Sequence, residues 1–275
     1  MIFRELAQLR LSELFSAWNN AWPVVFIQGL ALTEWYGDAL LRPMTDVDLL
    51  LPHGGAEEFR RLLESKGAIP FGDYRNTWDL GGLQIDLHED LWAADRLPGR
   101  AWCAPSISAE FLPSRRILQA LVPAPRLLFL HAVFHGVKHG FSRLVWDADL
   151  LLLHTRGFSA VPPGDKATVY DAIARARLRR IWGIDMGESG VPRDVVRRGR
   201  FIESLVSRYT VEGTGEMALA LCCPRLHQRF AYLWASALPP RRVLAQMYGD
   251  APYAVLLLKR AYAMIMLLLR AMVRR

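Results

Sequence analysis

Two aspartates separated by one apolar residue, Asp46 and Asp48, begin a run of apolar residues that extends to Leu51. In a β-strand successive side chains point to opposite faces, so the two carboxylates share one face and Val47 lies on the other. Their Cα atoms would then lie roughly 6.5 Å apart, close enough for both carboxylates to bind one hard cation. This spacing predicts a metal site, and the competing interpretation is a pair of solvent-facing acids at the start of a strand.

A third carboxylate lies on a later segment. Residues 83–88 alternate apolar and polar residues, which indicates a half-buried strand that presents Asp86 and His88 on one face. Asp86 could therefore join the first two aspartates if the strands are neighbours. His88 would orient Asp86 or contact a phosphate, and a histidine that only ends the strand is the alternative.

A turn suited to phosphate binding precedes the paired aspartates. Residues 23–29 form a β-branched and aromatic run closed by Gly29, which is typical of a strand followed by a turn. A helix predicted from Leu30 to Leu41 would place Gly29 at a helix N-terminus, where backbone NH groups favour phosphate oxygens. Arg42 could pair with phosphate bidentately, or it could be a solvated arginine in the turn.

Composition indicates a folded protein of a reducing compartment. The chain has 275 residues, and its 52% hydrophobic content supports a core. Its net charge of +7 is compatible with an anionic ligand, an anionic polymer or a membrane surface and does not choose among them. An odd count of three cysteines does not suit a disulfide framework, and the N-terminal segment lacks the apolar region of a signal peptide. We therefore expect a cytoplasmic location.

The order of these patterns predicts an α+β protein with two domains. Residues 1–100 alternate strand and helix patterns and should form an α/β domain, a mixed sheet with flanking helices. Residues 101–125 are rich in proline and read as an irregular linker. Residues 126–275 show only helical periodicity and should form an all-α domain.

Taken together, the motifs resemble those of the uncharacterised nucleotidyltransferase family, within the DNA polymerase β-like nucleotidyltransferase superfamily. The resemblance covers roughly residues 22 to 153. In the first half it is carried by Gln28-Gly29, residues 42–50 and residues 85–88. In the helical half the matching residues are His131, His135, Lys138, His139, Arg143, Leu144, Trp146 and Asp149.

The resemblance implies a polymerase β-like N-terminal domain and roles for individual residues. Asp46 and Asp48 match the paired metal-binding aspartates of the superfamily. Asp86 matches the third aspartate, which binds one metal and helps to activate the incoming hydroxyl. Gly29 matches the glycine of the nucleotide-binding turn, whereas Leu30 replaces the serine or glycine that usually follows, so a hydroxyl that would contact phosphate is missing.

The implied reaction explains why carboxylates are needed. Attack of a hydroxyl on the α-phosphorus of a nucleoside triphosphate builds negative charge on the non-bridging oxygens and on the departing pyrophosphate. Two Mg²⁺ ions, or Mn²⁺ in their place, offset this charge on both sides of the phosphorus. Carboxylates suit Mg²⁺ because it is a hard cation that prefers oxygen ligands.

Further candidates lie around these motifs. Lys138 would face the triphosphate from the helical domain, or it is an exposed lysine at a helix end. Thr45, His135 and Asp149 are candidates for supporting positions around the site, and Asp149 is expected to hold two helices together by hydrogen bonding. The three histidines that recur every four residues from His131 align on one helix face, but zinc is disfavoured because neither a glutamate nor a cysteine completes the pattern.

The acceptor and partners are less defined by the sequence. A small molecule, a peptide or a protein fits the pattern, and RNA is disfavoured because the arginine-dense helices lack interleaved aromatic residues. No DNA is expected. The apolar segment 251–275 either docks on the helical domain or makes a weak contact with a membrane surface.

The rival functions are an Asp-x-Asp glycosyltransferase and a non-catalytic nucleotide-binding module.

Overall fold

The computed structural model contains two compact units. One consists of Met1–Asp95 and Ser108–Leu128, and the other consists of Arg96–Ile107 and Phe129–Arg275. The residues that the structure describes are 2–18, 22–36, 42–51, 54–71, 76–94, 97–105, 107–115, 120–162, 165–187, 190–208 and 214–273.

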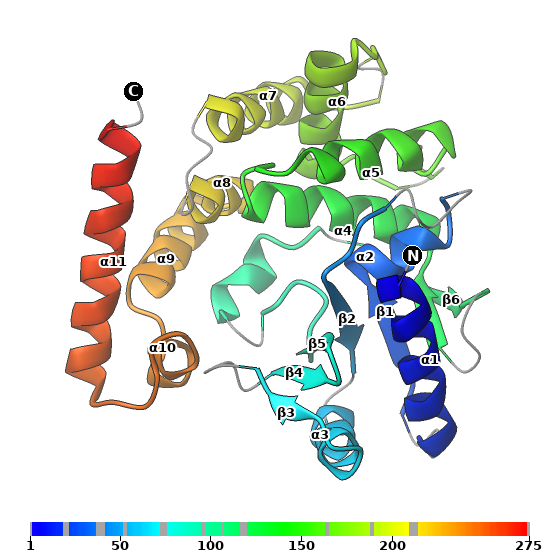
Figure 1. Ribbon diagram of the computed structural model, residues 1–275. Helices are drawn as coiled ribbons and strands as arrows, with labels where there is room; N and C mark the ends of the chain where they lie inside the picture. The colour runs from blue at the N-terminus through cyan, green and yellow to red at the C-terminus, as the bar shows by residue number, and fades with distance from the viewer. Residues whose placement is uncertain are drawn as a thin grey trace. The chain divides into compact units, whose positions relative to one another are not determined.

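The first unit is built on a mixed sheet (Figure 1). Its strands lie in the order β3-β4-β5-β2-β1-β7-β6. Their bounds are Val24–Ile27 (β1), Asp46–Leu50 (β2), Ile69–Pro70 (β3), Thr77–Leu80 (β4), Leu83–His88 (β5), Phe111–Pro113 (β6) and Ala120–Pro123 (β7). The pairs β2–β5 and β1–β7 are parallel, and the others are antiparallel. This sheet and its helices confirm the predicted α+β class.

The proline-rich segment 101–125 differs from the irregular linker predicted from the sequence. It contains β6 and β7, and β7 pairs in parallel with β1 so that Val24 lies opposite Ala120. The prolines stand at or near the ends of these short strands, where a missing NH donor does not interrupt the ladder. The domain boundaries drawn from the sequence stay a prediction.

Two helices cover one face of the sheet. Helix α1 (Ile2–Ala17) and helix α3 (Gly55–Ser65) meet there through Phe15 and Phe59, whose ring centroids lie 6.3 Å apart. Phe15 also packs edge-on against Phe26 of β1, with a centroid distance of 5.7 Å. The buried residues Leu11, Leu14, Phe15 and Trp18 lie three or four positions apart, as in the buried stripe of an amphipathic helix. These contacts identify the face of the sheet that forms the core.

The second unit is helical apart from the segment that carries a short 3₁₀ helix, η2 (Pro98–Trp102). Its helices are α4 (Pro125–Lys138, which begins in the first unit), α5 (Leu144–Thr155), α6 (Val169–Trp182), α7 (Arg193–Arg208), α8 (Thr214–Cys222), α9 (Leu226–Ala237), α10 (Arg241–Tyr248) and α11 (Tyr253–Val273). These helices agree with the helical periodicity of residues 126–275, and Pro224 lies between α8 and α9.

Buried ion pairs connect the elements of this unit. Arg177 of α6 donates two hydrogen bonds to the carboxylate of Asp147 in α5, at 2.7 and 2.8 Å. Arg100 of η2 donates to Glu216 of α8 at 2.7 Å. Burial alone would raise the pKa of Glu216, but the positive charge of Arg100 and the hydrogen bonds of the pair hold this pKa below its ordinary value. Segment 97–105 is thereby fixed to α8.

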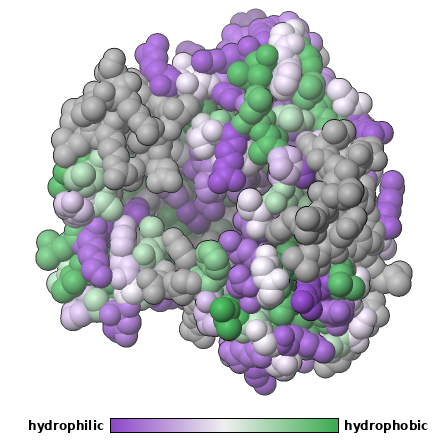
Figure 2. Space-filling view, viewed as in Figure 1, coloured by the Kyte–Doolittle hydropathy of each residue, from purple (hydrophilic) through white to green (hydrophobic). Residues whose placement is uncertain are grey.

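Helix α11 exposes much of its apolar surface. Leu258, Tyr262 and Ile265 are 70%, 66% and 55% exposed, whereas Leu256 is buried. Figure 2 shows hydrophobic and hydrophilic side chains mixed at the left of the view, where α11 lies. Within the described part of the chain, no helix combines the length and the hydropathy that crossing a membrane requires. Contact of α11 with a membrane surface stays a prediction.

Candidate functional site

The register of the sheet brings Asp48 and Asp86 side by side. Strands β2 and β5 run parallel, and Asp48 lies directly opposite Asp86. On the other side of β2, Ile27 pairs with Asp48 while Phe26 pairs with Leu49. Because Phe26 faces α1, Asp48 and Asp86 project from the opposite face of the sheet.

His88 completes this group. Its Nε2 atom lies 2.9 Å from Oδ1 of Asp48 and 3.5 Å from Oδ2 of Asp86. One ligand atom from each of the three residues lies within 4.8 Å of the other two, and this is the only such group of His, Cys, Asp and Glu side chains among the described residues. Asp48 is 6% exposed and His88 is 4% exposed. The Nε2 atom can therefore donate to Asp48 when it carries a proton, or serve as a ligand when it does not.

Asp86 is held from a neighbouring strand. Thr77 of β4 lies opposite Asp86, and its hydroxyl donates to Oδ1 of Asp86 at 3.1 Å. The other carboxylate oxygen, Oδ2, is the one nearest His88. A hydrogen bond to one oxygen of a carboxylate and a polar contact to the other restrict its rotation. Asp86 is thus fixed with one oxygen directed into the group.

The donor set fits a divalent cation. Two carboxylates supply hard oxygen ligands of the kind that Mg²⁺ and Mn²⁺ prefer, whereas an imidazole ligand suits softer transition metals. Asp48 and Asp86 are therefore the residues that would bind Mg²⁺. His88 is better placed to hold the carboxylate of Asp48, since a hydrogen bond to a ligating carboxylate fixes its orientation.

Asp46 stands apart from this group. It begins β2, pairs with Gln84 and shares its strand face with Asp48. It is half-buried, and the Thr45 hydroxyl lies 3.3 Å from Oδ1 of Asp46. The structure brings together Asp48, Asp86 and His88 and does not include Asp46 among them. The role of Asp46 as a metal ligand stays a prediction.

The predicted nucleotide turn begins beside Asp48. Helix α2 spans Gln28–Thr33, so Gly29 lies in its first turn, as expected, and the helix begins two residues earlier than predicted. Gln28 has φ 52°, a left-handed conformation that is uncommon outside glycine and is often found at functional turns. Leu30 is half-buried in this helix. Residues 37–41 of the helix predicted from 30 to 41 lie outside the described residues.

Arg42 lies against Gly29. A Cβ atom at Gly29 would come within 2.7 Å of an Arg42 guanidinium nitrogen and 3.2 Å of the Met44 sulfur. Glycine therefore permits the close approach of a guanidinium to the backbone of the turn. Arg42 is 9% exposed, so the solvated arginine considered from the sequence is not what the structure shows.

The remaining candidates lie in the second unit. Lys138 is the last residue of α4, and Asp149 is buried in α5. The rings of His135, His139 and Trp146 contact one another, with centroid distances of 4.5 to 5.4 Å. These histidines are not part of the metal-type group found among the described residues. The roles of Lys138, His135 and Asp149 in binding stay predictions.

Sequence reasoning missed the hydrogen bonds that Thr77 and His88 make to the two aspartates. A signal was available for Thr77, because a two-residue Gly81-Gly82 loop fixes the register of a hairpin and places Thr77 opposite Asp86. His88 was a candidate partner of Asp86. Its closer contact with Asp48 depends on the parallel pairing of β2 with β5, which no local pattern specifies.

Comparisons with known proteins add a family. A family model described as "Uncharacterised nucleotidyltransferase" matches residues 3–183. The solution structure of the antibiotic-resistance factor ANT(2'')-Ia is similar at 17% identity, over 76% of this chain and 95% of that chain, with a TM-score of 0.35. None of the curated proteins matches the chain significantly.

Proposed function

Since the chain belongs to the uncharacterised nucleotidyltransferase family, we propose that it transfers a nucleoside monophosphate from a nucleoside triphosphate to a hydroxyl or phosphate of an acceptor. We further propose that Mg²⁺ or Mn²⁺ is held by Asp48 and Asp86, with Asp46 as an additional ligand. The observation that carries this proposal is the pairing of Asp48 with Asp86 across parallel strands, with His88 against both. The acceptor is a small molecule, a peptide or a protein.

In the proposed reaction an acceptor oxygen attacks the α-phosphorus. A bond forms between these atoms, the bond from the α-phosphorus to the bridging oxygen breaks, and pyrophosphate leaves. A divalent cation bound at the carboxylates would offset the negative charge that develops on the phosphate oxygens. When the acceptor is a hydroxyl, Asp86 assists the loss of its proton through Oδ2, because Thr77 already donates to Oδ1.

Other residues have supporting roles in this proposal. His88 holds the carboxylate of Asp48 in place through the 2.9 Å contact. Arg42, next to Gly29, is suited to phosphate oxygens because a guanidinium can donate two parallel hydrogen bonds. Lys138 is a second candidate cation for the triphosphate. Thr45, the residue before β2, supports Asp46 through its hydroxyl.

The test uses nucleoside triphosphates labelled at the α-phosphate. The full chain is incubated with ATP, GTP, CTP or UTP, Mg²⁺ and a cell extract as the source of acceptor, and label transfer and pyrophosphate release are followed. Loss of a charge that acts on the transition state should lower the rate of Asp48→Asn at least about a hundredfold. Glu64→Gln is the matched control, because Glu64 is an exposed acid of α3.

Three results would contradict the proposal. Equal turnover by Asp48→Asn and wild type would remove Asp48 from the chemistry. Release of a nucleoside diphosphate from a nucleotide sugar, with no pyrophosphate from any triphosphate, would favour the glycosyltransferase alternative. Metal-dependent triphosphate binding without turnover would instead favour the non-catalytic nucleotide-binding module.

A further inference from the structure

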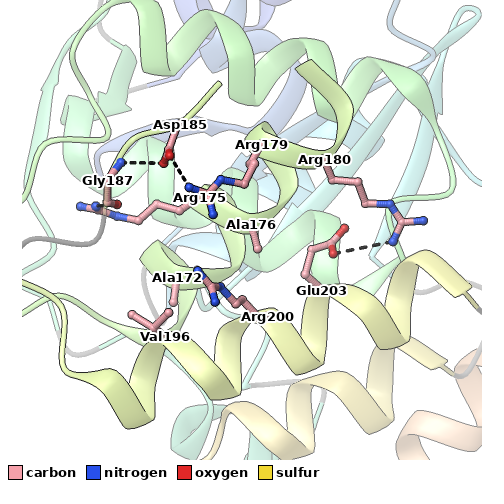
Figure 3. Close-up of a pocket in the computed structure, with 10 residues that line it drawn as sticks. All are labelled: Ala172, Arg175, Ala176, Arg179, Arg180, Asp185, Gly187, Val196, Arg200 and Glu203. Atoms are coloured by element: carbon pink, nitrogen blue, oxygen red, sulfur yellow. Dashed lines mark hydrogen bonds and ion pairs between the residues drawn. The ribbon is translucent and has the colours of Figure 1, made fainter. Parts of the chain in front are cut away.

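A pocket rich in arginine lies between α6 and α7, within the second unit (Figure 3). Its volume is about 240 Å³. Asp185 and Gly187, which follow α6, form one wall. The apolar side chains of Ala172, Ala176 and Val196 lie among the charged ones. The lining residues are Ala172, Arg175, Ala176, Arg179, Arg180, Asp185, Gly187, Val196, Arg200 and Glu203.

The wall formed by residues 184–187 is fixed in place by arginines of α6. Arg175 donates to the carbonyl oxygens of Met186 and Gly187, at 3.3 and 2.6 Å. Arg179 pairs with Asp185, which also accepts a hydrogen bond from the Gly187 NH at 3.0 Å. These bonds hold the segment against α6. This wall of the pocket is therefore held by the protein's own hydrogen bonds.

The charges in the pocket do not balance. Among the lining residues that the structure describes, four guanidinium groups face two carboxylates, which leaves a net charge of +2. Hydrogen bonds from Arg179 and Gly187, together with the charge of Arg200, lower the pKa of Asp185. Asp185 is therefore one of the two negative charges in this count. Figure 3 shows Arg180 directed to Glu203, 3.7 Å away, on the side opposite Arg179 and Arg200.

We propose that this pocket binds a small phosphomonoester, with Arg179 and Arg200 at the phosphate. A phosphomonoester carries a charge of about −1.5 to −2 at neutral pH, which matches the excess of the lining. Guanidinium groups donate paired hydrogen bonds to phosphate oxygens, and Ala172, Ala176 and Val196 offer apolar surface to a small organic group. The site is distinct from the carboxylates of β2 and β5 and does not depend on the proposed nucleotidyl transfer.

The shape and lining disfavour a nucleic acid strand. Single-stranded nucleic acids are bound by aromatic side chains that stack on successive bases, and none of the ten lining residues is aromatic. Pockets for drug-sized ligands have volumes of about 300–1,000 Å³, so this smaller volume suits a compact ligand.

Isothermal titration calorimetry with inorganic phosphate and with glycerol 3-phosphate tests the proposal, using the full chain at constant ionic strength. Hydrogen bonds to a charged ligand are strong, so Arg200→Gln should weaken binding at least about tenfold. Arg197→Gln is the matched control, because Arg197 is an exposed arginine of the same helix and does not line the pocket. The control should bind as wild type does.

A second variant tests whether weaker binding by Arg200→Gln comes from loss of the guanidinium or from loss of structure. Ala176→Glu introduces a carboxylate on the pocket wall without removing an ion pair, and it should also weaken binding. Asp48→Asn should bind phosphate as wild type does. No binding to wild type, or equal binding by wild type, Arg200→Gln and Ala176→Glu, would overturn the proposal. So would loss of binding in Asp48→Asn alone, because the phosphate would then be at the carboxylates.

Discussion

Asp48 owes its position to neighbours on both sides of its strand. Ile27 of β1 and Asp86 of β5 are its partners in the sheet, and His88 closes the group. Two carboxylates placed this close repel each other unless a positive charge or a hydrogen-bond donor lies between them. The imidazole of His88, with Nε2 at 2.9 Å from Asp48, can act as such a donor.

The central prediction at this scale concerns His88. His88→Ala should lower activity by about 10- to 100-fold, the usual effect of removing a partner that holds a metal ligand. The reason is that the carboxylate of Asp48 would lose the contact at 2.9 Å and rotate more freely. Titration of activity against Mg²⁺ concentration is the measurement, and the variant should require more metal for half-maximal activity.

His227→Ala provides the control, because His227 is exposed on α9. A purely structural role for His88 would lower the melting temperature without changing the metal dependence. An unchanged metal requirement in His88→Ala would therefore contradict the positioning role.

Strand alternation assigned Asp48 and Asp86 each to one face of its strand, but their pairing depends on β2 lying next to β5, and their role as metal ligands stays a prediction. The sequence predicted less about the residues that hold them. Thr77 lies on a strand whose pairing follows from the hairpin, whereas the contact of His88 with Asp48 requires knowledge of which strands are adjacent.

At the scale of elements, Gly215 reveals how tightly α8 packs on the end of α4. A Cβ atom at Gly215 would collide with the backbone carbonyl of Lys138 and approach that of Val137. Glycine inside a helix usually costs about 1 kcal/mol relative to alanine. Here the close contact of two backbones requires it, and backbone atoms cannot move aside as a side chain can.

We therefore expect Gly215→Ala to lower the free energy of unfolding by about 1–3 kcal/mol, the usual cost of overpacking. Urea unfolding followed by circular dichroism measures the change. Met217→Ala is the control on the same helix, because Met217 is 56% exposed and should change stability by less than about 0.5 kcal/mol. Stabilisation by Gly215→Ala, as helix propensity alone would give, would contradict this packing.

Strands with an alternating or closed apolar pattern were predicted, whereas the proline-containing strands β6 and β7 were not. The hairpin of β4 and β5 has alternating residues and a Gly81-Gly82 loop, which are local signals. Strands β6 and β7 have only three and four residues, and their prolines favoured a linker. Their place in the sheet depends on pairing between β7 and β1, which are distant in the sequence.

At the scale of the whole molecule, the family and the α+β class follow from the sequence, since residues 3–183 carry the family pattern. The division into units does not follow from the sequence. Segment 97–105 groups with the helical unit because its buried Arg100 pairs with Glu216, more than one hundred residues later. Residues beyond 183 lie outside the family match, and the arginine pocket is partly formed by them.

The central claim is that a nucleoside triphosphate binds with a divalent cation at Asp48 and Asp86. The most direct measurement is a thermal-shift comparison of the full chain with ATP, GTP, CTP and UTP, each with Mg²⁺, Mn²⁺ or a chelator, on wild type, Asp48→Asn and Glu64→Gln. Ligand at 100 times its Kd stabilises the native state by about 2.7 kcal/mol. We predict a metal-dependent rise in melting temperature with at least one triphosphate, retained in Glu64→Gln and lost in Asp48→Asn. A rise that Asp48→Asn retains, or none with any triphosphate, would contradict the claim.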